Sequence, residues 1–188
     1  MKPILNLLLA LVLPAALSAE TINLGAGRSA RLTLPDAWKA AKVLPGLPEN
    51  PAGPANVRYV TKNGSNDAVL LSLIPMADEE FADLAKLRAL VKESTQQFAD
   101  GSVERKANLK EIKVDGRTGF SCLFTDAELV GQPTKKDDYK TITSCFVYLG
   151  DNIMLAATIF SDDPGAKAYD EATRLLQSLT LSTPQKPI

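Results

Sequence analysis

Short turn sequences between pairs of apolar runs constrain the fold of this chain most. Asp115-Gly116 separates two alternating runs, and both residues tolerate the positive φ of a tight hairpin turn. Asp151-Asn152 separates TITSCFVYLG from NIMLAATIF in the same way. The segment KNGSN stands between NVRYVTK and DAVLLSLIP. This pattern predicts a succession of antiparallel hairpins.

Two segments have helical periodicity. Residues 78–99 begin with three acidic residues, which we expect to stabilise the helix start, and carry one apolar stripe: Phe81, Leu84, Leu87, Val91 and Phe98. A closing helix follows Asp162 or Asp163 as N-cap, with Pro164 in its first turn. Its expected buried residues are Ala168, Ala172, Leu175, Leu176 and Leu179. Strands and helices do not alternate regularly, so we predict an α+β fold, an antiparallel sheet flanked by helices.

The first residues have the order of a secretory signal peptide. Lys2 precedes an apolar run, which ends in the small residues Ser18 and Ala19. Asn6 and Pro14 interrupt this run, and it is shorter than the roughly 20 residues that span a bilayer. We predict a signal peptide over residues 1–19, a single domain over residues 20–188, a periplasmic location and no stable membrane insertion after cleavage.

Charge and residue types exclude several function classes. Without Lys2 the mature chain has 20 basic and 22 acidic residues, a net charge of −2, which argues against nucleic acid as a partner. The chain has no histidine, so it lacks the usual nucleophile-activating base and imidazole ligands for zinc. No phosphate-binding or hydrolase motif is present. We therefore predict no enzymatic activity, no cofactor and no metal site.

Cys122 and Cys145 are the two cysteines of the chain. Pairing the runs 117–130 and 137–149 symmetrically about a loop centred on residues 132–135 sets the two cysteines opposite each other. Opposed residues of antiparallel strands are close enough for a disulfide. A redox couple would more often form a CxxC sequence, and a metal site would need further ligands. We predict a structural disulfide, which would stabilise an exported protein by roughly 3 kcal/mol.

Two segments are candidates for partner binding. The first combines Trp38 with prolines at every third position, which align on one edge of a polyproline II segment: Pro45, Pro48, Pro51 and Pro54. It is either a rigid loop over a sheet edge or an exposed docking ridge. The second is a predicted hairpin tip with mixed charge: Lys135, Lys136, Asp137, Asp138 and Tyr139. It is either a solvated loop end or a contact with a partner.

The order of these elements resembles the PsbP-like family. A strand running into LPDAW, a hairpin, a long helix, IKVDGRTGF, paired strands and a helix ending in LLQSLTL cover Ile22 to Leu181. The family includes the photosystem II extrinsic subunit, a Ran-binding import factor and DcrB-like envelope proteins. The resemblance implies an α/β/α sandwich that binds or stabilises other proteins. The metal-binding histidines of the photosystem subunit and the lipidation cysteine of the DcrB-like proteins are absent here.

These observations favour a non-catalytic protein-interaction module of the periplasm: an adaptor, an assembly factor or an immunity protein. Its expected partner is another protein of the periplasm or envelope. One alternative is a carrier of small ligands, with a pocket between sheet and helix lined by Phe120 and Phe124. Another is a hydrolase using paired carboxylates, for which Asp137-Asp138 and Asp162-Asp163 are the candidates.

Overall fold

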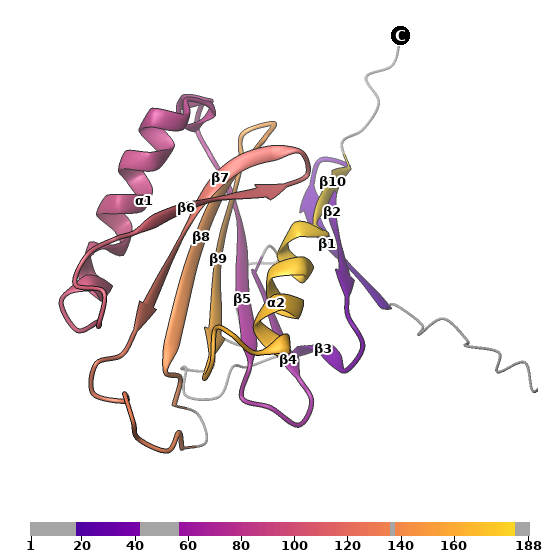
Figure 1. Cartoon of the computed structure of the whole chain (residues 1–188). Helices are drawn as coiled ribbons and strands as arrows, with labels where there is room; N and C mark the ends of the chain where they lie inside the picture. Colours follow the sequence, from indigo (N-terminus) through magenta and orange to yellow (C-terminus); the bar gives the residue numbers. More distant parts are fainter. Residues whose placement is uncertain (1–17, 42–56, 136–137, 183–188) are drawn as a thin grey trace, which may run out of the picture.

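The computed structural model describes residues 18–41, 57–135 and 138–182. Within these ranges the chain forms two antiparallel sheets, two α-helices and a short 3-10 helix (Figure 1). The elements are β1 (Ser18–Gly25), β2 (Arg28–Leu34), β3 (Trp38–Ala41), β4 (Val57–Lys62), β5 (Ala68–Pro75), η1 (Glu80–Ala82), α1 (Leu84–Ala99), β6 (Leu109–Val114), β7 (Arg117–Thr125), β8 (Thr141–Gly150), β9 (Ile153–Ser161), α2 (Lys167–Gln177) and β10 (Thr180–Ser182).

The larger sheet has seven strands in the order β3-β4-β5-β9-β8-β7-β6. Three of its neighbouring pairs, β4–β5, β6–β7 and β8–β9, are the predicted hairpins. Asp115 and Gly116 have φ of 49° and 71° at one turn, and Asp151 and Asn152 have φ of 50° and 56° at another. The predicted α+β class and the three turn positions are therefore confirmed.

The N-terminal hairpin lies outside the larger sheet. β1 pairs with β2, and β10 pairs with the other edge of β2, which gives a separate three-stranded sheet. Ile22, Ala30 and Leu32 from this sheet are fully buried in the main core. A single sheet was expected, and the second exists because this hairpin buries its apolar side chains against α2 instead of extending the larger sheet.

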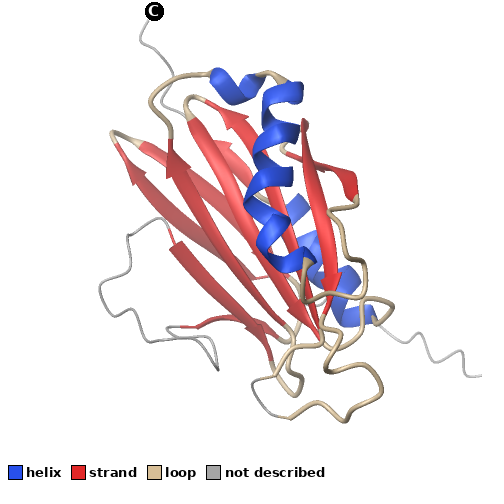
Figure 2. Ribbon diagram, turned by 90° about the vertical axis from the view of Figure 1, so that its left-hand side faces the viewer, coloured by secondary structure: helices blue, strands red, loops and turns tan. Residues whose placement is uncertain are grey.

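Helix α1 begins later than predicted. Asp83 is its N-cap, and the Asp83 carboxylate accepts hydrogen bonds from the backbone nitrogens of Ala85 and Lys86. The acidic residues at 78–80 precede this cap and lie around η1. Of the predicted stripe, Leu87 and Val91 are fully buried, whereas Leu84 and Phe98 are 46% and 36% exposed. α1 lies on the face of β7 and β8 (Figure 2).

Helix α2 covers the opposite face of the larger sheet and lies between the two sheets (Figure 1). Its predicted buried stripe is confirmed by burial of Ala168, Ala172, Leu175, Leu176 and Leu179. The predicted N-cap is wrong, because the helix starts at Lys167 after Ala166. Asp163 instead accepts a hydrogen bond from the Gly165 backbone, in the turn before the helix.

The predicted register of β7 and β8 is wrong by one residue. Cys122 pairs with Ser144, and Cys145 pairs with Ser121. A shift of one residue moves a side chain to the other face of a sheet. Cys122 accordingly packs with Ala99 on the α1 side, and Cys145 belongs to the core on the α2 side. Both cysteines are free, so the predicted disulfide is not formed.

The predicted signal peptide falls almost entirely outside the described residues, which start at residue 18. Ser18 and Ala19 belong to β1 and pair with Leu34 and Thr33. No helix in the described ranges is long and apolar enough to cross a membrane.

Candidate functional site

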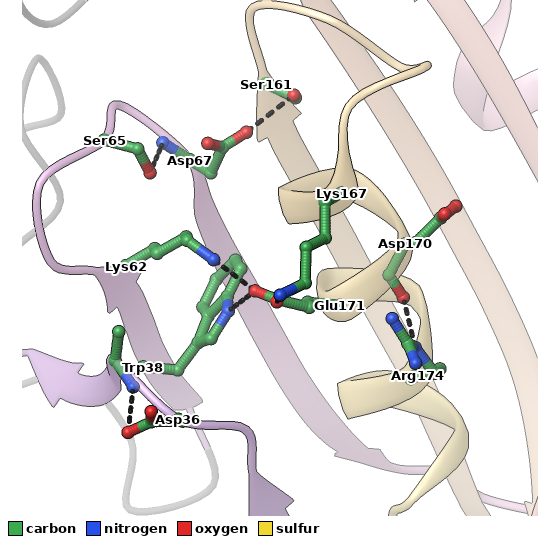
Figure 3. A network of polar contacts seen from close by, with 11 residues as sticks. Asp36, Trp38, Lys62, Ser65, Asp67, Ser161, Lys167, Asp170, Glu171 and Arg174 are labelled. Atoms are coloured by element: carbon green, nitrogen blue, oxygen red, sulfur yellow. Dashed lines mark hydrogen bonds and ion pairs between the residues drawn. The ribbon is translucent and has the colours of Figure 1, made fainter.

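Trp38 is a core residue at the edge of the larger sheet. Its ring is 4% exposed, and its Nε1 donates a hydrogen bond to Oε2 of Glu171 on α2 at 3.0 Å (Figure 3). Lys62 on β4 pairs with the same carboxylate oxygen, and the Lys167 ammonium lies 3.5 Å from Oε1. This network ties α2 to β3 and β4. Because its indole is buried, Trp38 offers little surface to a partner.

The Glu171 carboxylate is held in its ionised form. Hydrogen bonds from Lys62 and then from Trp38 lower the pKa of Glu171 from 4.5 to about 2, although burial opposes them. Hydrogen bonding to a carboxylate stabilises the charged state and so depresses its pKa. A general acid needs a pKa near the working pH, so this carboxylate is suited to anchoring α2 and not to proton transfer.

The predicted hairpin tip is only partly described. Lys135 is exposed, and the backbone oxygens of Lys135 and Asp138 accept hydrogen bonds from Asn66 Nδ2. The Tyr139 ring packs on Phe160 with 4.9 Å between centroids. Lys136 and Asp137 lie outside the described residues, as do Pro45, Pro48, Pro51 and Pro54. A partner contact at these positions stays a prediction.

The most distinctive surface is the part of the larger sheet that α1 leaves uncovered. α1 lies over β7 and β8, and the same face continues across β9, β5 and β4 beside the helix (Figure 2). Strand register places five side chains together on this face, and we call them the open sheet face: Tyr59, Leu70, Ser72, Ala156 and Thr158. All five are partly exposed, and none is charged.

The open sheet face is unusual in composition. A sheet face in contact with water normally carries polar residues between the buried ones. Here Leu71 and Leu73 point to the core on the α2 side, but the alternating positions are again apolar or small. Ile74, which follows on the same side of β5, is 40% exposed. Exposed apolar patches of this kind mark binding surfaces in proteins.

A hollow of about 380 Å³ opens where α1 ends. Phe124 and Ile142 are directly paired on β7 and β8, and the Phe98 ring lies 5.8 Å from that of Phe124. The lining residues are Gln97, Phe98, Gly101, Ser102, Phe124, Asp126, Glu128, Tyr139, Lys140 and Ile142. The hollow therefore combines aromatic walls with a charged rim.

The pocket expected for a small-ligand carrier is only partly the observed hollow. Phe124 lines the hollow, as expected. Phe120 instead lies beneath α1, where the Arg88 guanidinium sits 5.3 Å from its ring, in a separate apolar cluster. The two phenylalanines share a face of β7 but do not meet in one cavity.

Glu104 holds the strand end next to the hollow through two hydrogen bonds to Thr125. Its carboxylate accepts hydrogen bonds from the Thr125 backbone nitrogen at 2.8 Å and from Thr125 Oγ1 at 2.9 Å. Burial raises the pKa of Glu104, but these hydrogen bonds outweigh it and leave the pKa lowered. Thr125 stands between Phe124 and Asp126, so the contact fixes both lining residues in place.

Three kinds of reactive group are relevant to catalysis among the described residues: a metal cluster, a reactive thiol and a carboxylate pair. No group of three or more histidine, cysteine, aspartate or glutamate residues among them could hold a metal ion. Burial raises the pKa of Cys145 to about 12 and raises that of Cys122, so both thiols stay protonated and unreactive. Asp163 caps a turn, and Asp67 accepts a hydrogen bond from buried Ser161. Of the carboxylate pairs expected for a hydrolase, Asp137 lies outside the described residues, and neither Asp162 nor Asp163 lines the hollow at the end of α1.

The open sheet face was not found from the sequence. The runs AVLLSLIP and IMLAATIF are apolar on both alternating sets of positions, which normally indicates strands covered on both sides. Only the strand order and the position of α1 show that one side stays open. A signal was nevertheless present, because these runs contain no charged residue.

The arrangement of elements is similar to solved structures of low sequence identity. The solution structure of cyanobacterial PsbP from Synechocystis sp. PCC 6803 matches with a TM-score of 0.52 and 9% identity, covering 91% of this chain and 95% of that one. The chain has the PsbP-like fold. The expected resemblance is confirmed at this level.

Two further solved structures are compared with the chain by coverage and identity. The Ran-binding protein Mog1p of Saccharomyces cerevisiae has a TM-score of 0.45 and 13% identity, covering 88% and 96% of the two chains. LpqN of Mycobacterium tuberculosis, involved in cell envelope biogenesis, has a TM-score of 0.41 and 14% identity, covering 90% and 93%. No protein-family model and no curated protein sequence matches the chain.

Proposed function

We propose that this chain is a non-catalytic protein-interaction module of the periplasm and that it binds its partner through the open sheet face. The observation that carries the proposal is the uncharged, partly exposed sheet surface beside α1. Burying it against a partner would remove apolar area from water without stripping water from a charge. The signal-like sequence of residues 1–19 supports export.

An adaptor, an assembly factor and an immunity protein all fit this surface. They differ in how they bind: an immunity protein forms a tight one-to-one complex with its toxin, and an adaptor binds a resident complex more weakly. Stoichiometry and affinity therefore distinguish them once a partner is isolated.

The test is affinity capture of partners from an envelope extract of the source cells with matched variants. Thr158→Lys places a cation in the open sheet face. Thr180→Lys makes the same change at an exposed position of β10, outside that face. A partner that is captured by the wild type and by Thr180→Lys, and lost with Thr158→Lys, supports the proposal. Equal capture by both variants would contradict it.

A second function, carriage of a small ligand, is favoured by one specific observation. The hollow at the end of α1 has a volume of about 380 Å³, within the range of roughly 300–1,000 Å³ typical of small-molecule sites. Its chemistry is distinct from that of the open sheet face, because its rim is charged.

A further inference from the structure

We propose that the hollow at the end of α1 binds a small organic cation with an aromatic or alkyl body. This site goes beyond the proposed protein interaction, because the hollow can take a ligand whether or not the open sheet face has a partner. Three properties carry the proposal: aromatic walls, more carboxylates than ammonium groups on the rim, and backbone hydrogen bonds that fix the segments carrying the rim residues.

Aromatic and aliphatic side chains surround the hollow on several sides. Phe98 comes from α1, Phe124 from β7, Ile142 from β8 and Tyr139 from the loop before β8. Phe98 is 36% exposed to solvent, which is high for a phenylalanine that also packs against Phe124. A ligand body placed against these rings would gain apolar contact, and a cation near a ring face gains electrostatic attraction.

The rim carries two carboxylates and one ammonium. Asp126, Glu128 and Lys140 line the hollow, and none of the ion pairs found in the described part of the chain involves any of them. Asp126 and Lys140 approach each other through their backbones, where Asp126 N donates to Lys140 O at 2.8 Å. With two carboxylates and one ammonium the rim has a net charge of −1, which matches a ligand with one positive charge.

The framework around the rim is fixed by backbone hydrogen bonds. Val103 N donates to Thr125 O at 2.8 Å, and Ala127 N donates to Gly101 O at 3.1 Å. Ser102 and Asp126 form an isolated β-bridge between the same two segments. With the Glu104–Thr125 contacts, these bonds position the carboxylates before any ligand arrives, and a preorganised site loses less entropy on binding.

Three probes with the same phenylethyl body and different charge test the proposal: 2-phenylethylamine, 2-phenylethanol and 3-phenylpropionate. Each is titrated into ¹⁵N-labelled protein, and amide shifts report both affinity and location. We expect the amine to bind roughly tenfold more tightly than the neutral or anionic probe, with shifts at Phe98, Phe124 and Ile142. Equal affinity for the three probes, no measurable binding, or shifts confined to other regions would overturn the proposal.

Isosteric variants separate the role of the rim from general electrostatics. The double variant Asp126→Asn, Glu128→Gln removes both carboxylates and keeps the oxygen with which Asp126 caps the Glu128 backbone. The control, Glu93→Gln with Glu111→Gln, changes net charge equally at exposed positions that do not line the hollow. Loss of most of the amine affinity in the rim variant alone is expected. Similar affinity of the amine for both variants would overturn the proposal. That result would leave the proposed protein interaction standing, because the Thr158→Lys variant tests it separately.

Discussion

Cys122 and Cys145 lie on adjacent strands of the seven-stranded sheet but on opposite faces of it. Each is paired with a serine on the neighbouring strand, Ser144 and Ser121 respectively. Cys122 packs under α1, and Cys145 packs in the core beneath α2. Two side chains on opposite faces of a sheet cannot be joined by a disulfide without a shift in register.

We therefore expect two protected thiols in the native protein. Both are about 1% exposed and have raised pKa values, so a thiol reagent should react slowly before denaturation and with both thiols after it. Reductant should leave the unfolding midpoint unchanged. Protein that is denatured without reductant and shows no free thiol would contradict this register.

Gly119→Ala should destabilise the fold by at least about 2 kcal/mol. A methyl group at this position would meet Phe146 O at 2.2 Å and Val147 Cγ2 at 2.6 Å, and the strand backbone cannot move aside easily. Gly101→Ala is the matched control, because no atom lies within 4 Å of its added carbon. Urea unfolding of both variants measures the difference; equal stabilities would show that β7 and β8 are not packed this closely.

Glu171 should make the free energy of unfolding depend on pH in the acidic range. Its folded-state pKa is about 2 against 4.5 unfolded, so its contribution is present above pH 4.5 and is lost as pH falls toward 2. This contribution is at most about 3 kcal/mol, because each unit of pKa shift corresponds to about 1.4 kcal/mol and solvent screens the ion pairs of Glu171. Unfolding measured from pH 7 to pH 2 should show a shallower decline for Glu171→Gln than for wild type. Glu111→Gln, at an exposed strand position, should keep the wild-type slope.

Asp83→Ala should cost about 1 kcal/mol, the usual loss when a helix N-cap is removed. The Asp83 carboxylate accepts from Ala85 N at 2.7 Å, and no other side chain caps this end of α1 in the described structure. Asp100→Ala, at the opposite end of the same helix, should not destabilise, because a negative charge there opposes the helix dipole. Thermal unfolding of the two variants checks this; a larger loss at Asp100 would argue against the cap.

Local features of the fold could be predicted from the sequence because they depend on neighbours along the chain. The turn at Asp115-Gly116 follows from backbone preferences of its two residues, and the buried stripe of α2 follows from helical spacing. Features that join distant segments could not. The pairing of β10 with β2, and the position of α1 over β7 and β8, are set by tertiary packing.

The cysteine register shows how a small error in a loop changes a site. Symmetric pairing assumed a centre between residues 133 and 134, but Thr125 pairs with Thr141, which centres the loop on Pro133. Moving the centre by half a residue changes the register by one residue. Cys122 then lies opposite Ser144, and Cys122 and Cys145 point to opposite faces of the sheet. Loop length alone does not determine this, because the described loop contains its own turn from Asp126 to Gly131.

Site-specific photocrosslinking in the source cells tests the central claim most directly. A photoreactive phenylalanine analogue is placed at position 158 in the open sheet face and, separately, at position 180 on β10. We predict a discrete crosslinked protein from position 158 and little or none from position 180. Crosslinking that is absent at position 158, or equal at both positions, would contradict binding through the open sheet face.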